Sequence, residues 1–167
     1  MESRSSTFSP GTSYNILFVC TGNTCRSPMA EAVARAELER RGWTHVKVAS
    51  AGTSAEPGAA AAAPAVSVAA RRGIDLAPHA STQLDEKLVE WADLILVMSL
   101  SHYEAVERLG GGSKVALLGD FAAGEEGAGA PVLDPFGGSE EVYEETIREL
   151  ERLVSSSLDR LAPILHP

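Results

Sequence analysis

The chain has 167 residues, 44% of them hydrophobic and 22% charged, which is typical of one soluble globular domain. Its formal net charge of −9 argues against nucleic acid or an anionic membrane as a partner, because both are themselves negatively charged. No apolar run approaches the roughly 18 residues that a membrane span requires. The two cysteines do not make a disulfide framework in a chain of this length, so we expect a reducing, cytoplasmic location.

The residues Met1–Tyr14 are polar and predict a flexible N-terminal tail, followed by a single domain over residues 15–162. The tail has no apolar segment of the kind found in a secretory signal. The domain alternates short apolar runs with longer amphipathic segments. In chain order we expect a strand at 15–19, a helix at 27–41, a strand at 46–49, helices at 64–72 and 84–92, a strand at 94–98, a helix at 102–109, a strand at 115–118, a loop at 119–138 and a helix from Ser139 to Pro163.

Several residues predict how these elements begin, end and pack. Ser27 suits the N-cap of the first helix, and Gly42 suits the position just past its end. The expected apolar side of the first helix includes Met29, Val33 and Leu38, and the expected buried stripe of the last helix comprises Tyr143, Ile147, Leu150, Val154, Leu158 and Leu161. In the helix at 84–92, Trp91 is expected on the buried face. The strand at 94–98 is apolar throughout, as in a parallel sheet covered on both faces. The pattern therefore predicts an α/β fold, a parallel sheet with helices on both sides.

The most informative stretch is the segment Cys20–Pro28, with the sequence CTGNTCRSP, between the first strand and the first helix. Backbone N–H groups and the positive end of the helix dipole can bind an oxyanion here. The same groups and Arg26 favour the thiolate of Cys20, which is the nucleophilic form of the side chain. Arg26 can also bind two phosphate oxygens in a fork. These features predict attack of the Cys20 sulfur on phosphorus, forming a cysteinyl-phosphate intermediate.

This segment resembles the signature loop of the low-molecular-weight protein tyrosine phosphatase family. Its residues are most similar to those of the bacterial protein-arginine phosphatase branch. The resemblance extends over about Asn15–Leu161 and implies a single-domain, three-layer sandwich with a four-stranded parallel sheet of order 2-1-3-4. It also implies that Asp134, in an Asp-Pro motif, is the general acid. The catalytic residues are then Cys20, Arg26 and Asp134, and the phosphate-binding residues are Thr21, Gly22, Asn23, Thr24, Cys25, Arg26 and Ser27.

The resemblance to the arginine branch implies phosphoarginine in proteins as the substrate. Thr24 stands where tyrosine-specific members usually have a larger apolar residue, and Phe136 can stack on a guanidinium group. Three alternatives remain: a tyrosine phosphatase, an arsenate reductase and a non-catalytic phosphoprotein-binding module. The arsenate reductase chemistry needs further cysteines, and none follows Cys25. Phosphorylated proteins are the expected partners, and the enzyme is expected to be a monomer that opposes a protein-arginine kinase.

Three further expectations concern single residues. Asn23 is expected to tie the loop backbone together through hydrogen bonds. Cys25 is either a packed thiol or a redox partner that forms a reversible disulfide with Cys20. His79 is expected to pack or hydrogen-bond rather than to catalyse. The four histidines lack metal-ligand spacing, so we expect neither a metal nor another cofactor.

Overall fold

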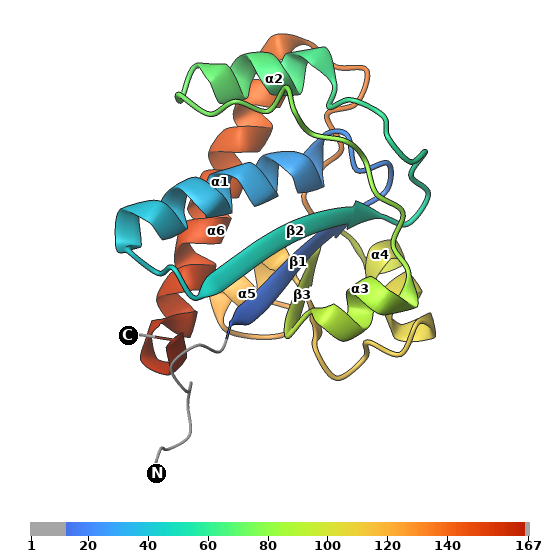
Figure 1. The fold of residues 1–167 in the computed structure, drawn as a ribbon, viewed down its shortest axis with the longest axis vertical. Coiled ribbons are helices and arrows are strands. Elements are labelled where there is room, and N and C mark those ends of the chain that lie inside the picture. Colours follow the sequence, from blue (N-terminus) through green and yellow to red (C-terminus); the bar gives the residue numbers. More distant parts are fainter. Residues whose placement is uncertain (1–12, 166–167) are drawn as a thin grey trace.

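A computed structural model describes residues 13–165, which form an α/β domain (Figure 1). The polar tail expected at residues 1–14 therefore lies almost entirely outside the described residues. The elements in chain order are β1 (Tyr14–Cys20), α1 (Arg26–Arg41), β2 (Val46–Gly52), α2 (Ala63–Ala70), α3 (Glu86–Trp91), β3 (Leu94–Val97), α4 (Leu100–Arg108), β4 (Val115–Leu117), α5 (Leu118–Ala123) and α6 (Glu140–Leu165).

The described strands form one parallel sheet of order β2-β1-β3-β4, which confirms the expected topology. β1 is central, and its last residue, Cys20, pairs with Gly52 at the end of β2. Val19 pairs with Val97 of β3 on the other side. The carboxyl ends of these three strands therefore meet at one edge of the sheet, where ligand sites form in open α/β folds.

Alternating side chains of β1 face two separate cores. Ile16 and Phe18 pack on the side of the sheet that carries α1, α2, α5 and α6. Leu17 and Val19 pack on the opposite side, against α3 and α4. This alternation follows from the period of two in a β-strand. All four residues of β3 are buried, as expected for a parallel strand covered on both faces.

The two longest helices bury the stripes that the sequence predicted. In α1 the predicted apolar residues Met29, Val33 and Leu38 are each at most 5% exposed, and Gly42 ends the helix in the left-handed conformation with a φ of 71°. In α6 the whole predicted stripe is buried, and it comprises Tyr143, Ile147, Leu150, Val154, Leu158 and Leu161. Burying one large apolar side chain stabilises the fold by about 1.5–3 kcal/mol, so these stripes fix both helices on the sheet.

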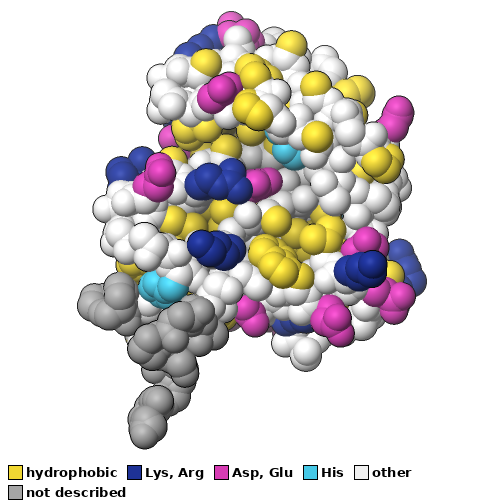
Figure 2. Space-filling model, viewed as in Figure 1, with side chains coloured by type: hydrophobic (Ala, Val, Ile, Leu, Met, Phe, Trp, Pro, Cys, Tyr) yellow, Lys and Arg dark blue, Asp and Glu magenta, His cyan; other side chains and the backbone are white. Residues whose placement is uncertain are grey.

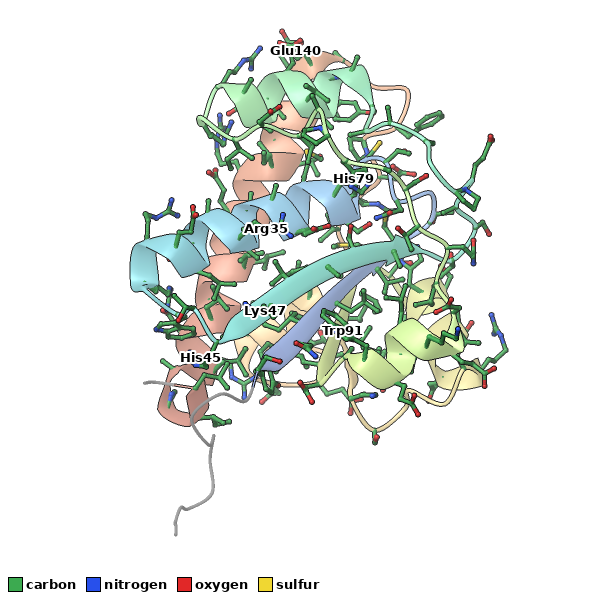
Figure 3. The ribbon with its side chains drawn as sticks, viewed as in Figure 1. Arg35, His45, Lys47, His79, Trp91 and Glu140 are labelled. Atoms are coloured by element: carbon green, nitrogen blue, oxygen red, sulfur yellow. The ribbon has the colours of Figure 1, made fainter. Side chains whose placement is uncertain are left out.

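Three expectations about the fold were wrong. Trp91 does not lie in the core: it is 37% exposed on α3, and Val89 is the buried residue of that helix (Figure 3). The segment 119–138 is not a loop throughout, because α5 continues directly from β4 and buries Leu118. Pro163 does not end α6, which extends to Leu165 because Leu165 is itself buried and its carbonyl lies 2.7 Å from Nε2 of His45.

The described surface carries charges of both signs among apolar side chains (Figure 2). Neighbouring opposite charges form ion pairs along α1, such as Arg35 with Glu31 and Arg41 with Glu37. No helix among the described residues is both long enough and apolar enough to span a membrane.

Candidate active site

The predicted signature loop, residues 20–27, joins the end of β1 to the start of α1 at the carboxyl edge of the sheet. Cys20 is the last residue of β1 and Arg26 is the first residue of α1. The neighbouring strand β2 lies close to this loop because it ends in glycine. A Cβ atom at Gly52 would lie 2.4 Å from the carbonyl oxygen of Thr21 and 2.9 Å from the amide nitrogen of Asn23. Glycine at this position therefore allows the loop backbone to pack against β2.

Asn23 holds the loop together, as the sequence predicted. It is fully buried, and its φ of 57° is left-handed, a conformation that asparagine tolerates better than most residues. Its Nδ2 donates to Ser27 Oγ at 2.8 Å and to Ser50 Oγ at 2.9 Å. Its Oδ1 accepts from the amide of Thr82 at 2.8 Å. The side chain thus joins the start of α1, the end of β2 and the segment before α3.

Ser27 contacts Cys20 rather than capping α1, so the N-cap prediction was wrong. The helix begins at Arg26, with Cys25 at the cap position and no side-chain capping bond. Ser27 Oγ lies 2.8 Å from Cys20 Sγ, and the Ser27 amide donates to the same sulfur at 3.4 Å. Because Asn23 donates to Ser27 Oγ, the Ser27 hydroxyl can donate either to the sulfur or to the carbonyl of Ala51 at 3.4 Å, and the sulfur is the nearer partner. The hydroxyl and the amide of Ser27 therefore both lie within hydrogen-bond distance of Cys20 Sγ.

Arg26 is buried, and it is held by a residue of its own loop and by a segment 106 residues further along the chain. Its Nη1 donates to the carbonyl of Val132 at 3.0 Å, and its Nη2 donates to Thr21 Oγ1 at 3.4 Å. Val132 is in turn held against the end of β3, because its amide donates to the carbonyl of Met98 at 2.9 Å. The segment that carries Asp134 is thereby joined to both the sheet and the signature loop.

Asp134 lies beside Arg26 and is accessible to solvent. Its Oδ2 is 3.7 Å from Nη2 of Arg26, and half of its side chain is exposed. Its other oxygen, Oδ1, accepts from the amide of Phe136 at 3.1 Å, which forms an Asx turn across the buried Pro135. The turn fixes one carboxylate oxygen and leaves the other directed to the arginine. The structure therefore brings Arg26 and Asp134 together beside the loop that begins at Cys20.

The two predicted selectivity residues lie in different surroundings. Thr24 is half-buried, and its carbonyl accepts from the amide of Ala62 at 2.9 Å, so its backbone is anchored. Phe136 is 74% exposed, and its ring is available to a bound group.

Cys25 is 5% exposed and its Sγ lies 3.3 Å from the hydroxyl of Tyr143. Burial raises the pKa of the Cys25 thiol, and the predicted disulfide with Cys20 remains a prediction.

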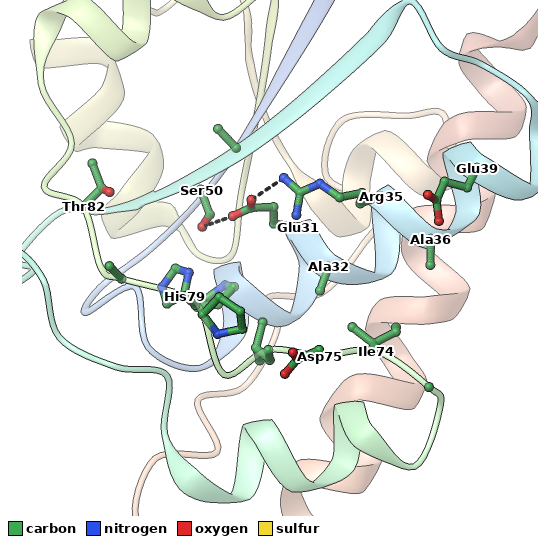
Figure 4. Close-up of a pocket in the computed structure, with 16 residues that line it drawn as sticks. Glu31, Ala32, Arg35, Ala36, Glu39, Ser50, Ile74, Asp75, His79 and Thr82 are labelled. Atoms are coloured by element: carbon green, nitrogen blue, oxygen red, sulfur yellow. Dashed lines mark hydrogen bonds and ion pairs between the residues drawn. The ribbon is translucent and has the colours of Figure 1, made fainter.

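His79 makes a hydrogen bond, as expected. Its Nε2 lies 2.7 Å from the carbonyl oxygen of Asn23, and Figure 3 places it beside the amino end of α1. His79, Ser50 and Thr82 also line a surface hollow of about 610 Å³ (Figure 4). In this hollow Glu31 accepts from Ser50 Oγ at 2.6 Å and pairs with Arg35. The lining of this hollow includes none of the three predicted catalytic residues.

Sequence reasoning missed two contributors to the site. The first is the backbone carbonyl of Val132, which accepts a hydrogen bond from Arg26. Every residue has such a carbonyl, so the sequence could not single this one out and only the tertiary structure reveals it. His102 is buried, and its Nε2 lies 2.8 Å from Thr21 Oγ1. The signal in the sequence is its position three residues after Ser99, the residue at which α4 is capped. Within residues 13–165 no three His, Cys, Asp or Glu side chains lie close enough together to hold a metal ion.

A cysteine loop at the carboxyl edge of a parallel sheet, closed by an arginine and faced by a carboxylate, defines the class of cysteine-dependent protein phosphatases. The model of the family described as low molecular weight phosphotyrosine protein phosphatase matches residues 15–163. The chain belongs to this family. The predicted membership and enzyme class are therefore confirmed.

Known relatives include both branches of the family. A protein-arginine-phosphatase of Bacillus subtilis is 44% identical over 142 residues, which is 84% of this chain and 91% of the relative. A low molecular weight protein-tyrosine-phosphatase of Streptomyces coelicolor is 37% identical, over 83% of this chain and 87% of the relative. A solved YwlE arginine phosphatase, a mutant with a phosphorylated active-site serine, has a TM-score of 0.82 and 42% identity, with coverage of 88% of this chain and 95% of that one.

Proposed function

We propose that this chain is a protein-arginine phosphatase, which removes phosphate from phosphoarginine in proteins through a cysteinyl-phosphate intermediate. The observation that carries the proposal is Thr24 in the signature loop of a chain that is 44% identical to a protein-arginine-phosphatase. The solved relative with a phosphorylated active-site serine supports covalent transfer to the side chain in the position of the nucleophile.

In the first step, the Cys20 thiolate attacks phosphorus. The S–P bond forms as the P–N bond breaks, and the electron pair of that bond leaves with the guanidine nitrogen. Asp134 gives its proton to this nitrogen, which is a poor leaving group unless it is protonated. The half-exposed carboxylate, with Oδ2 not engaged by the Asx turn, suits this transfer.

In the second step, water attacks the phosphorus of the intermediate. Asp134, now ionised, accepts a proton from the water as the new O–P bond forms and the S–P bond breaks. The products are inorganic phosphate and the Cys20 thiolate, which the Ser27 hydroxyl and amide stabilise at 2.8 and 3.4 Å. No electron donor or acceptor is consumed in either step.

Arg26 and the loop amides stabilise the charge on the phosphoryl oxygens in both steps. The guanidinium group is fixed from behind by Val132 and Thr21, so its other N–H groups can face the substrate. Loop amides and the start of α1 supply further donors. Residues 21–27 are therefore the proposed phosphate-binding loop.

Selectivity for arginine is proposed to come from three side chains. Asp134 can pair with the cationic guanidinium group of the substrate when it is ionised, and it can donate the proton to the leaving nitrogen when it is protonated. The Thr24 hydroxyl adds a polar group at the half-buried wall of the loop, where an aromatic substrate ring would prefer an apolar one. The exposed ring of Phe136 can stack on the guanidinium plane.

Tyrosine phosphatase activity is the second candidate. The family description and the relative from Streptomyces coelicolor, which is named a protein-tyrosine-phosphatase, favour it. Arsenate reduction lacks a resolving cysteine, because the whole sequence holds only Cys20 and Cys25. We further propose that the enzyme acts in the cytoplasm as a monomer, through a domain at residues 15–162, and opposes a protein-arginine kinase.

The decisive experiment compares kcat/KM for a phosphoarginine peptide and a phosphotyrosine peptide of otherwise equal sequence. Higher kcat/KM for phosphoarginine supports the proposal, and the reverse order supports the tyrosine candidate. Cys20→Ser is the matched variant: it should bind phosphate but lose turnover to below about 1% of wild type. Substantial turnover by this variant would remove Cys20 as the nucleophile.

A further inference from the structure

A row of polar side chains connects Arg26 to a buried imidazole that the catalytic steps above do not use. Nη2 of Arg26 lies 3.4 Å from Thr21 Oγ1, and Thr21 Oγ1 lies 2.8 Å from Nε2 of His102. On the far side of the ring, Nδ1 of His102 lies 3.1 Å from Ser99 Oγ. His102 belongs to α4 and is 2% exposed, although Thr21 at the other end of the row is at the surface.

Chemistry fixes the direction of the contact with Arg26, and we assign the other two contacts so that each pairs one donor with one acceptor. An arginine side chain only donates, so Thr21 Oγ1 accepts from Arg26. The hydroxyl proton of Thr21 is then free to point to Nε2 of His102, which accepts it. A neutral imidazole that accepts at Nε2 carries its proton on Nδ1, and this proton is donated to Ser99 Oγ. In this arrangement each contact in the row pairs one donor with one acceptor, and the Ser99 hydroxyl can donate to Ser101 Oγ at 3.0 Å.

The arrangement needs a neutral imidazole, and the surroundings favour one. Burial first, and then the charge of Arg26, lower the pKa of His102 to about 4, while Asp134 has a smaller opposing effect. A second cation beside Arg26 is therefore disfavoured at neutral pH. A neutral His102 keeps an acceptor directed at the Thr21 hydroxyl.

We propose that His102 is a positioning residue for phosphoryl transfer, which acts through the Thr21 hydroxyl to fix the plane of the Arg26 guanidinium group. Val132 holds Nη1 of Arg26 at 3.0 Å and Thr21 holds Nη2, so two contacts on the protein side set the orientation of one planar group. The remaining N–H groups then meet the phosphoryl oxygens at a defined angle. A Thr21 hydroxyl without His102 could rotate, and one of the two contacts would weaken.

Fixing this plane matters more in the transition state than in the bound ground state. Loop amides can bind a phosphate dianion in several orientations. In the transition state the phosphoryl group is planar, the attacking sulfur must lie in line with the leaving nitrogen or oxygen, and the N–H groups of Arg26 must be aligned with the phosphoryl oxygens. His102 is therefore expected to contribute more to kcat than to KM. The inference rests on the proposed role of the signature loop in phosphoryl transfer, but not on the choice of arginine over tyrosine.

The test replaces His102 with leucine, which has a similar volume and no acceptor. We expect kcat/KM for an aryl phosphate to fall roughly 10- to 100-fold, mostly in kcat, as for a small misalignment of a catalytic group. His102→Gln should recover much of the loss, because its amide oxygen can accept from Thr21. Val106→Ala is the control: Val106 is a buried residue of α4, so its truncation lowers stability without touching the row.

Two further measurements separate positioning from general destabilisation. Thr21→Val combined with His102→Leu should lose no more activity than the worse single variant, because both act on the same contact with Arg26. By calorimetry, His102→Leu should weaken the binding of vanadate, which mimics the transition state, more than that of inorganic phosphate. This affinity ratio tests His102 whether or not the wild type prefers phosphoarginine, and wild-type turnover of the two peptides tests the proposed function separately.

The inference would be overturned by any of three results: a His102→Leu variant within about twofold of wild-type kcat/KM, equal losses in the leucine and glutamine variants, or losses that add in the double variant. A Val106→Ala variant that loses as much activity per folded molecule as His102→Leu would also contradict it. In that case the effect would come from the packing of α4 and not from the contact with Thr21.

Discussion

Asn23→Ala offers a strong test of how the signature loop is held. The substitution removes the three side-chain hydrogen bonds to Ser27, Ser50 and Thr82, each of 2.8 or 2.9 Å. At about 1 kcal/mol each they contribute about 3 kcal/mol, and an alanine in the left-handed region costs roughly 1 kcal/mol more. We therefore expect the free energy of unfolding to fall by about 4 kcal/mol.

The same change should reduce catalysis because it removes the donor that directs the Ser27 proton to Cys20. A displaced loop should lower kcat/KM for an aryl phosphate by roughly 100-fold. Stability is measured by urea unfolding, and kcat/KM is measured well below the urea transition. Under these conditions the variant is folded, so a lower kcat/KM reports a changed loop geometry and not a smaller amount of folded protein.

Asn23→Gly separates the side chain from the backbone. Glycine adopts a φ of 57° without strain but makes none of the three hydrogen bonds. If the bonds hold the loop, Asn23→Gly should lose nearly as much stability as Asn23→Ala, and it should also lose activity. A glycine variant with wild-type stability and kcat/KM would refute the reasoning, because asparagine would then be needed only for its backbone conformation.

Three other substitutions have definite expected outcomes. Thr24→Ile should lower kcat/KM for phosphoarginine relative to phosphotyrosine by about 10- to 200-fold, since it replaces a hydroxyl with apolar bulk; equal ratios in both proteins would exclude Thr24 as the selective residue. Asp134→Asn should lower kcat about 100- to 10,000-fold for poor leaving groups but much less for an activated aryl phosphate; equal losses on both would indicate a structural role. Gly52→Ala should displace the loop, because its Cβ would lie 2.4 Å from the Thr21 carbonyl oxygen. The free energy of unfolding, measured in urea, should fall by about 1–3 kcal/mol. An unchanged midpoint of the urea transition would show that the loop can move away without cost.

The amino-acid sequence alone predicted most of the elements, though not α5, and it predicted the chemistry of the loop. The continuous apolar run in β1 and the period of 3.6 in α6 predicted which side chains are buried, because these patterns depend only on neighbouring residues. The spacing of Cys20 and Arg26 at a strand–helix junction likewise predicted an oxyanion site, since both residues belong to one short segment. The strand order came from resemblance to a family, and the structure confirmed it.

Only the tertiary structure decided how the site is supported, because its contacts join segments far apart in the chain. Arg26 and Val132 are 106 residues apart, and Thr21 and His102 are 81 residues apart. No local pattern encodes such pairs: they form when β1, β3 and the segment before α6 end at the same edge of the sheet. The same reason explains Ser27, which local rules predict to cap the helix. Its hydroxyl contacts the sulfur of Cys20 instead, because the buried side chain of Asn23 donates to that hydroxyl.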